Sequence, residues 1–271
     1  MTRLVPIDEI DPRACAALEG LVFDIDDTVT RAGRLERAAF DEMWRLSEAG
    51  LRLVAVTGRP LGWCDVIARH WPIDIAVAEN GACWAHASGA HVSWGMFDGE
   101  AARASQRVLL DRVIAAVAHE MPEVALAEDQ WARRCDIAFD VGEAKRVEGA
   151  ELERLLGIIR AEGARVVVSS VHAHVIAGDY DKPRGVVRAV REVLGAGSDV
   201  AADPARWLFV GDSANDAAAF EWFPLSAGVA NVRAWLDRLP LAPAYVARSD
   251  RGAGFAEIAQ VVLERRARSG A

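Results

Sequence analysis

The stretch Leu21-Val22-Phe23-Asp24-Ile25-Asp26-Asp27-Thr28 decides the fold, because an apolar run ends there in three carboxylates and a hydroxyl. Short runs rich in valine and leucine are typical of strands buried on both faces of a parallel sheet. Residues 51–56 and 207–210 are similar runs that also end in polar residues. Because the ends of such strands meet at one edge of the sheet, we expect a ligand site at that edge.

Helical patterns separate these runs along the chain. Residues 34–49 show one pattern, which Gly50 closes. Residues 185–194 show another, introduced by Pro183 and closed by Gly195. Strands that alternate with helices predict a doubly wound α/β core.

The middle of the chain has a different pattern, which begins with a stretch rich in tryptophan, histidine and glycine at residues 83–99. We expect helices at residues 101–119 and 149–162, a strand at 134–141, and a hairpin of 165–170 with 173–177. These elements predict an inserted α+β cap domain at residues 83–179. The core then consists of residues 1–82 and 180–271, with a frayed polar tail at 264–271.

The charge balance restricts the partners of the protein. Asp and Glu number 40 against 31 Lys and Arg, a formal net charge of −9 in 271 residues. A negative field repels nucleic acids and anionic membrane surfaces, so neither is an expected partner. No apolar stretch approaches the roughly 18 residues of a spanning helix, and residues 1–20 lack the features of a secretory signal. We therefore expect a cytoplasmic protein.

Cysteine and lysine are informative through their distribution. The four cysteines are scattered without a C-x-x-C pair, which in a cytosolic chain indicates reduced structural thiols. Lys145 and Lys182 are the only lysines among the 31 basic residues. Because an ammonium and a guanidinium differ in shape, a lysine kept at a motif position suggests that a compact charge is needed there. Lys145 lies in a polar stretch and is more simply explained as a solvated residue.

The paired aspartates of the first run permit phosphoryl transfer. Asp24 would attack phosphorus to give an aspartyl phosphate, while Asp26 would protonate the leaving oxygen and then deprotonate the attacking water. The crowding of these carboxylates with Asp212 and Asp216 is hard to explain without a cation. Mg²⁺ prefers hard oxygen ligands, here Asp24, Asp212 and the backbone carbonyl of Asp26, while Asn215 and Asp216 would hold waters or support the ligands.

Two other segments would bind the phosphoryl group. Thr57 would donate its hydroxyl and backbone N–H to phosphoryl oxygens, and Gly58 would let the backbone come close. Lys182 would supply positive charge on the other side. Taken alone, each segment also fits an ordinary turn, helix cap or solvated side chain. Their order and their positions at strand ends or loops favour phosphoryl chemistry.

Together these segments resemble the haloacid dehalogenase (HAD) superfamily of phosphatases, whose motifs are D-x-D-x-T, a Thr or Ser, a Lys, and an acidic G-D-x-x-N-D loop. The corresponding parts of this chain are residues 24–28, Thr57, Lys182 and residues 211–216. A cap placed just after Glu79-Asn80-Gly81 resembles the Cof-type branch, which includes sugar-phosphate phosphatases. The resemblance implies a Rossmann-like core with a parallel sheet, Mg²⁺ dependence and hydrolysis of phosphomonoesters.

The resemblance also implies roles for individual residues. Asp24 is the expected nucleophile, Asp26 the acid and base, and Asn80 a residue near the cap hinge or the substrate. The residues expected to bind phosphate or substrate are Thr57, Gly58, Arg59, Asn80, Lys182 and Asn215, and those expected at the metal are Asp24, Asp26, Asp212 and Asp216.

The chain departs from the family pattern at two positions. Asp27 stands where the family often has glycine, and aspartate tolerates the left-handed backbone region better than most residues. Pro183 follows the motif lysine, and proline suits the first turn of a helix. Residues 252–257 are reminiscent of sucrose-phosphate and mannosylglycerate-phosphate phosphatases.

Cap residues that face the core are expected to select the substrate. The candidates are Trp94, Trp131, Arg133, Arg134, His172 and His174. Trp131 could stack on a sugar ring and the arginines could bind a second anionic group, although tryptophan in a small α+β layer more often packs. Two histidines without a third ligand are usually ordinary surface residues rather than metal ligands.

The working hypothesis is an Mg²⁺-dependent phosphomonoesterase that acts on a small phosphorylated metabolite, a sugar or glycerate phosphate. A phosphosugar mutase or phosphotransferase is the alternative within the enzymes, because an aspartyl phosphate can also be discharged to a sugar hydroxyl. A receiver-like signalling module also uses clustered aspartates, a Thr and a Lys. It needs neither the second aspartate of D-x-D nor a cap, so it is the less favoured alternative.

Overall fold

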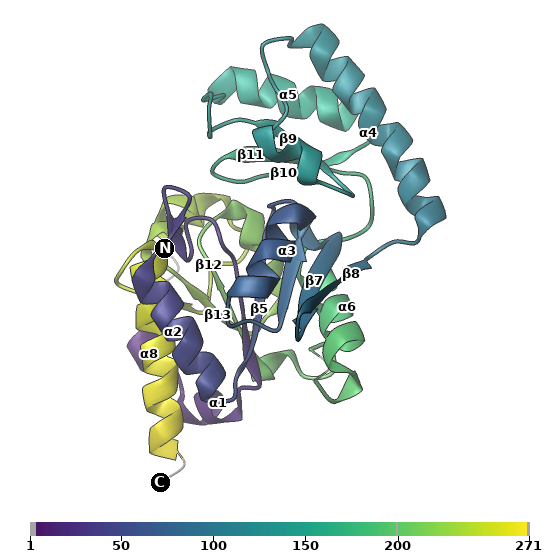
Figure 1. Ribbon diagram of the computed structural model, residues 1–271. Coiled ribbons are helices and arrows are strands. Elements are labelled where there is room, and N and C mark those ends of the chain that lie inside the picture. The colour runs from purple at the N-terminus through teal and green to yellow at the C-terminus, as the bar shows by residue number, and fades with distance from the viewer. Residues whose placement is uncertain (1–3, 199, 270–271) are drawn as a thin grey trace.

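The computed structural model describes residues 4–198 and 200–269, which form a core with a smaller cap above one end of its sheet (Figure 1). The core sheet has nine strands in the order β1-β14-β13-β12-β2-β5-β6-β7-β8. Neighbouring strands from β1 to β6 in this order are parallel, whereas β7 and β8 are antiparallel to their neighbours. The strands are β1 (Val5–Pro6), β2 (Gly20–Phe23), β5 (Arg52–Val56), β6 (Ile75–Ala78), β7 (Cys83–Ser88), β8 (His91–Met96), β12 (Trp207–Gly211), β13 (Leu225–Gly228) and β14 (Tyr245–Val246).

Helices pack on both faces of this sheet, which confirms the α/β fold. Alternate residues of β2 enter two apolar clusters, since Leu21 and Phe23 lie in one and Val22 in the other. The first cluster includes residues of α1 (Pro12–Ala17), α2 (Arg37–Glu48), α3 (Leu61–His70) and α8 (Arg251–Ser269), and the second includes residues of α6 (Lys182–Leu194) and α7 (Ala217–Trp222). Short 3-10 helices lie at Ile7–Glu9, Glu79–Gly81, Glu128–Ala132, Ala196–Ser198, Pro204–Arg206, Ala214–Asp216 and Ala230–Arg238.

The insertion begins later than expected. β7 and β8 pair with β6 and extend the core sheet, so residues 83–96 belong to the core sheet rather than to the cap. The sequence could not show this, because a hairpin at a sheet edge has the same pattern wherever it pairs. Another small difference lies before α2, where Arg34–Leu35 form β4, antiparallel to β3 (Thr30–Arg31).

The tail is more ordered than expected, because α8 continues to Ser269 instead of fraying from residue 264. Two arginines of its last turns bind the N-terminal segment. The Arg265 guanidinium donates to the Asp8 carbonyl at 2.6 Å, and that of Arg266 donates to the Leu18 carbonyl at 2.8 Å.

The cap is a three-stranded antiparallel sheet in the order β10-β11-β9, covered by two helices (Figure 1). Its elements are α4 (Glu100–Glu120), β9 (Ile137–Asp140), α5 (Gly149–Ala161), β10 (Arg165–Val168) and β11 (His172–Ile176), which confirms the expected hairpin and helices. In β11, Ala173 and Val175 pack into the apolar cluster of the cap helices. Because side chains alternate along a strand, His172 and His174 lie on the opposite face, toward the core.

Two linkers join the core and the cap, and they contact each other. The chain leaves the core at Phe97 and returns through Tyr180, and the two ring centroids are 6.0 Å apart. From the cap, the Arg165 guanidinium donates to the carbonyls of Gly178 at 2.7 Å and Tyr180 at 2.8 Å. The return linker is therefore held on both sides before α6 begins.

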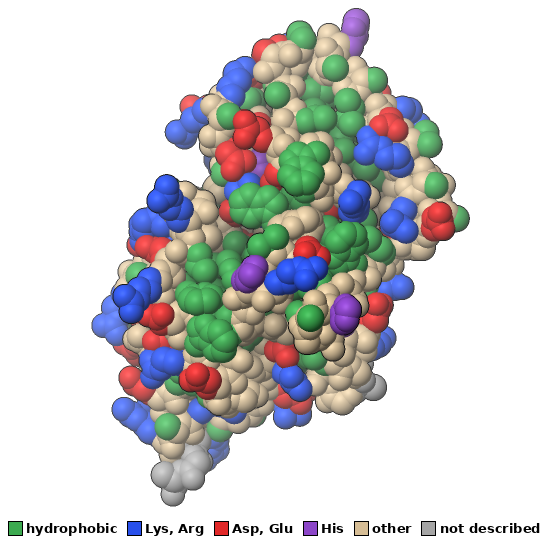
Figure 2. Space-filling model, viewed as in Figure 1, with side chains coloured by type: hydrophobic (Ala, Val, Ile, Leu, Met, Phe, Trp, Pro, Cys, Tyr) green, Lys and Arg blue, Asp and Glu red, His purple; other side chains and the backbone are tan. Residues whose placement is uncertain are grey.

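Apolar side chains are also exposed on both core and cap, as the view in Figure 2 shows. The large exposed ones include Trp63 on α3, Trp94 on β8 and Trp131 in the cap. Among the described residues, none of the helices combines the length and the apolar character that a bilayer span requires.

The Glu79 carboxylate connects the core to the cap through backbone hydrogen bonds. It is fully buried and accepts N–H groups from Leu61 at 3.0 Å, Arg134 at 2.9 Å, Cys135 at 2.6 Å and Asp136 at 3.0 Å. Burial raises the pKa of Glu79 to about 7, whereas the backbone donors favour its charged form. Because every donor points at an oxygen, this carboxylate fixes the start of the cap segment 134–136 against the core.

We expect Glu79→Gln to destabilise the protein by about 2 to 4 kcal/mol, because an NH₂ group would then face buried N–H donors. Urea unfolding monitored by circular dichroism measures this. Glu257→Gln is the matched control, since Glu257 also accepts backbone N–H groups, from Arg248 and Ser249, but is partly exposed. The control should cost less than about 1 kcal/mol. Equal losses in the two variants would contradict the role given to Glu79.

Candidate active site

Three strands deliver the motif residues to one edge of the sheet. β2 lies between β12 and β5 in the sheet order. Asp24 directly follows β2, Thr57 follows β5 and Asp212 follows β12. The parallel direction of these strands places all three residues at their carboxyl ends, where the sequence predicted a ligand site.

A buried cluster of carboxylates forms beneath the cap. Carboxylate oxygens of Asp24, Asp212 and Asp216 lie within 4.8 Å of one another. Lys182 Nζ donates to Asp24 Oδ1 and to Asp216 Oδ1, in both cases at 2.6 Å. The lysine is buried, at the first position of α6, so its ammonium is held between two carboxylates with little solvent.

When all three carboxylates are ionised, the cluster carries more negative charge than the one ammonium neutralises. Burial raises the pKa of Asp24 to about 8, although the Lys182 ammonium acts in the opposite direction. Burial, followed by repulsion from Asp216 and Asp24, raises the pKa of Asp212 well above its usual value. Asp216 and Asp24 also outweigh the effect of burial on Lys182 and raise its pKa. Hard, closely spaced oxygens with unbalanced charge fit a divalent cation such as Mg²⁺.

Asp216 has both oxygens engaged by the protein. Besides the bond to Lys182, it accepts the backbone N–H of Asp212 at 2.9 Å and that of Ser213 at 3.2 Å on Oδ2. A side chain at Gly211 would meet this oxygen at 2.5 Å, which explains the glycine of the motif. Asp216 thus shapes the acidic loop and positions the lysine.

Two residues that sequence reasoning missed hold Asp212. Thr28 Oγ1 donates to Asp212 Oδ1 at 3.1 Å, and Asn231 Nδ2 donates to Asp212 Oδ2 at 2.9 Å and to the Asp27 carbonyl at 3.0 Å. Thr28 belongs to the quoted motif, so its hydroxyl could have been assigned. Asn231 lies alone in a 3-10 helix, outside any motif, and only the tertiary structure identifies it. Asp27 adopts the left-handed backbone that the departure from glycine predicted, with φ 56°.

The expected backbone contact of Thr57 is wrong. Its N–H donates to the Val77 carbonyl at 2.9 Å, as part of the sheet, so it is not available to a phosphoryl oxygen. Its hydroxyl oxygen accepts the Arg59 N–H at 3.0 Å, which leaves the hydroxyl proton to donate. A side chain at Gly58 would come within 2.7 Å of the His174 ring, so this glycine makes room for a cap residue.

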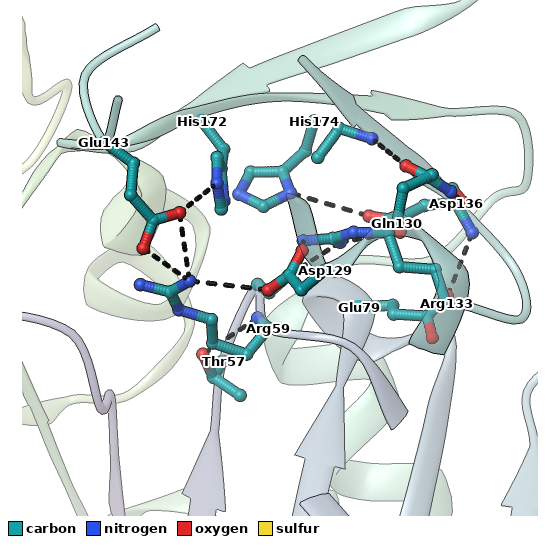
Figure 3. Close-up of polar contacts among 12 residues, drawn as sticks. Thr57, Arg59, Glu79, Asp129, Gln130, Arg133, Asp136, Glu143, His172 and His174 are labelled. Atoms are coloured by element: carbon teal, nitrogen blue, oxygen red, sulfur yellow. Dashed lines mark hydrogen bonds and ion pairs between the residues drawn. The ribbon is translucent and has the colours of Figure 1, made fainter. Parts of the chain in front are cut away.

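Arg59 joins the core site to the cap, and Figure 3 shows its guanidinium between the cap residues Glu143 and Asp129. Its Nε and Nη2 donate to the two oxygens of Asp26 at 2.9 and 3.0 Å. Its Nη1 donates to Glu143 at 3.2 Å and to Asp129 at 3.4 Å, both of which belong to the cap. The guanidinium is therefore shared between one core carboxylate and two cap carboxylates.

Two cap histidines face the carboxylate cluster and are buried, in contrast to the expectation of ordinary surface residues. His172 Nε2 lies 2.9 Å from Glu143 Oε2, and His174 Nδ1 lies 3.6 Å from Asp136 Oδ2 (Figure 3). Burial, with the Arg133 guanidinium as the next cause, lowers the pKa of both rings, so they are neutral at pH 7.

The other cap candidates do not reach the site. Trp131 is 82% exposed on the surface. Trp94 lies on the core sheet, where its Nε1 donates to Asp65 at 2.9 Å. Arg133 is buried and donates to the Gly58 carbonyl and to Asp136, so it braces the cap against the core. The backbone N–H of Arg134 is bound to Glu79, and its side chain lines no part of the cavities described below.

Asn80 lies behind the site rather than in it. It is buried, in left-handed backbone, and its N–H donates to the Thr57 carbonyl at 3.0 Å. Its side-chain nitrogen is 3.3 Å from the position that a Cβ at Gly58 would occupy. Neither atom of its amide group has a hydrogen-bond partner within the described residues.

Two adjoining cavities open between core and cap. The inner one, over Asp24 and Asp26, has a volume of about 10 Å³, enough for one water molecule. Asn215, which accepts from the Ser213 hydroxyl at 2.7 Å, also lines it. The outer cavity measures about 310 Å³ and is lined by Asp26, Asp27, Thr30, Ala32, Gly33, Arg59, Gly142, Glu143, Ser170 and Val171. The cap is therefore closed over the carboxylates, with space for a small organic group beside them.

Comparison with known proteins gives results that agree with this geometry. A phosphoglycolate phosphatase from Natronomonas pharaonis is 27% identical over 219 residues, which cover 79% of this chain and 85% of that protein. A structure from Thermoplasma acidophilum superposes with a TM-score of 0.70 at 17% identity and covers 92% of this chain and 98% of its own. The sucrose-phosphatase of Synechocystis sp. PCC6803, solved with sucrose and phosphate, has a TM-score of 0.63 at 16% identity and covers the same shares.

The structural similarities show the fold, whereas the match to a family profile shows the family. The profile of the sucrose-6F-phosphate phosphohydrolases matches residues 18–257, a range that includes all four motifs and the whole cap. The chain therefore belongs to the sucrose-6F-phosphate phosphohydrolase family, within the HAD superfamily of phosphatases that its motifs resemble.

Proposed function

We propose that the protein is an Mg²⁺-dependent phosphomonoesterase that hydrolyses a phosphorylated sugar through an aspartyl phosphate on Asp24. The observation that carries the proposal is the buried Asp24 carboxylate, 2.6 Å from Lys182 Nζ and within 4.8 Å of the carboxylates of Asp212 and Asp216. The site lies beneath a cap, which would keep bulk water from the intermediate.

The donor set suits a magnesium ion held by Asp24, Asp212 and the backbone carbonyl of Asp26. Bound there, Mg²⁺ would neutralise the cluster and stabilise negative charge on the phosphoryl oxygens. Asp216, which the sequence placed at the metal, is better explained as a positioning residue, because its oxygens already accept from Lys182 and the backbone. Asn231 and Thr28 would hold the Asp212 carboxylate in a fixed orientation.

Two side chains, Asp24 and Asp26, would carry out the formation and the hydrolysis of the aspartyl phosphate. An oxygen of Asp24 forms a bond to phosphorus while the bond to the leaving oxygen breaks, and Asp26 gives that oxygen its proton. Asp26 then takes a proton from water, whose oxygen displaces Asp24 and releases phosphate. Since Arg59 holds both oxygens of Asp26, it must release one of them to the substrate. Glu143 offers the guanidinium an alternative partner on the cap.

The charges around the outer cavity favour a sugar over a hydroxy acid such as glycolate as the leaving group. Among the residues that line the two cavities, Arg59 is the only cation, and it already contacts three carboxylates. The cap contributes Glu143, Ser170 and the neutral His172. A glycolate or glycerate would meet Glu143 with like charge, whereas sugar hydroxyls would find both donors and acceptors.

Asp24→Asn should abolish turnover, because the amide is a poor nucleophile. Release of phosphate from p-nitrophenyl phosphate and from a panel of phosphorylated metabolites measures this, with Mg²⁺ and with EDTA in its place. Chromatography of the sugar products shows whether phosphate is moved to another hydroxyl instead of to water. Residual activity above about one tenth of the parent value, or full activity in EDTA, would refute the assignment.

Lys182→Arg should lower kcat by at least about a hundredfold although the charge is kept, because a planar guanidinium does not fit between the two carboxylates. Lys145→Arg is the matched control, as Lys145 is the other lysine of the chain and lies at the surface. The control should leave kcat within about twofold. An unchanged kcat/KM in Lys182→Arg would disprove the need for a compact charge.

Glu143→Ala should lower kcat/KM for a sugar phosphate by about tenfold and raise it for 2-phosphoglycolate, because an acceptor for hydroxyls and a repulsive charge are both removed. Sucrose 6F-phosphate and glucose 6-phosphate serve as the sugar substrates. Hydrolysis of p-nitrophenyl phosphate, which has no hydroxyls on its leaving group, corrects for any general effect on Arg59. Glu148→Ala, at an exposed cap residue, is the control. Preference of the parent protein for 2-phosphoglycolate would contradict this assignment of the leaving group.

A further inference from the structure

A second groove lies on the core, away from the carboxylate cluster. Its volume is about 550 Å³, within the range of small-molecule sites. It is lined by Phe97, Arg184, Val187, Arg188, Arg191, Glu192 and Trp222. None of these residues lines either cavity of the candidate active site.

The groove is rich in positive charge for a chain of net charge −9. Arg184, Arg188 and Arg191 are spaced by four and three residues on α6, so they lie on one face of the helix. Arg184 is engaged by Asp179 at 2.7 Å and by Asp181 at 3.7 Å. None of the residues that the structure describes forms an ion pair with Arg188, which is exposed. Its guanidinium is therefore available to an anion.

Two aromatic rings line the groove together with this guanidinium. The Arg188 guanidinium carbon lies 5.4 Å from the centre of the Phe97 ring. Trp222, at the end of α7, is partly exposed, and its ring stands edge-on to Phe223 at 4.9 Å, which fixes its orientation. An accessible, fixed indole can stack a flat ring, and an unpaired guanidinium in the same groove can bind an anion attached to that ring.

We propose that this groove binds a nucleotide, with the base on Trp222 and the phosphates on Arg188. Glu192 would accept a hydrogen bond from a ribose hydroxyl. An inorganic anion would contact only the arginine side of the groove, and a neutral nucleoside only the Trp222 side. Each would therefore bind more weakly than a nucleotide.

The position of the groove gives such a ligand access to both linkers of the cap. Phe97 belongs to the outgoing linker and packs against Tyr180 of the returning one. Arg184 is bound to Asp179, also in the returning linker, and α6 itself begins with Lys182. A nucleotide in the groove would therefore contact Phe97 of the outgoing linker and Arg184, which is bound to the returning one.

Calorimetric titration with ADP, adenosine and inorganic phosphate tests the proposal. The experiments use the full chain in EDTA, which limits metal-assisted binding at the carboxylate cluster. We expect ADP to bind parent protein and Asp24→Asn alike, and to bind at least about tenfold more tightly than adenosine or phosphate. Arg188→Ala should weaken ADP binding by at least about tenfold.

Arg37→Ala is the matched control, because Arg37 is an exposed helix arginine with a single ion pair and should leave ADP affinity within about twofold. Trp222→Phe keeps a ring in place and should weaken ADP binding less than Trp222→Ala does. Absence of saturable ADP binding to the parent protein would overturn the proposal. Binding that is lost in Asp24→Asn but kept in Arg188→Ala would also overturn it, because the ligand would then occupy the catalytic cluster.

Discussion

The ammonium of Lys182, held between the carboxylates of Asp24 and Asp216, is the contact on which the site depends. It joins the end of β2, the start of α6 and the loop after β12, three parts of the chain that are far apart in sequence. Buried charge is tolerated only when it is paired, so the three elements must meet in this arrangement for the core to be stable. The pairing is incomplete, because Asp212 adds a further carboxylate, and that excess makes the cluster suitable for a cation.

Two side chains, Glu79 and Arg59, connect the cap to the core. Glu79 collects backbone N–H groups from the cap segment, and Arg59 bridges the proposed acid, Asp26, to cap carboxylates. Arg59 therefore connects Asp26 directly to the cap. Glu143 and Asp129 both belong to the cap, so two of the three ion pairs of Arg59 depend on the position of the cap.

The sequence pattern predicted correctly those positions that strand ends and helix starts determine. Asp24 was expected at the end of a strand and Lys182 just before a helix, and the structure places them at the end of β2 and at the start of α6. The free N–H expected at Thr57 was wrong, since the sheet continues through that residue to β6. The roles of His172 and His174 depend on which face of the cap sheet meets the core. That face is set by packing of α4 and α5, which a short strand pattern does not reveal.

The dependence of unfolding free energy on Mg²⁺ tests the central claim most directly. If Asp24 and Asp212 share a divalent cation, Mg²⁺ at about a hundred times its dissociation constant should stabilise the parent protein by about 2.7 kcal/mol. The same ion should not stabilise Asp212→Ala, whereas Asp237→Ala, at an exposed aspartate, should respond as the parent does. A parent protein indifferent to Mg²⁺, or an equal gain in Asp212→Ala, would contradict the account.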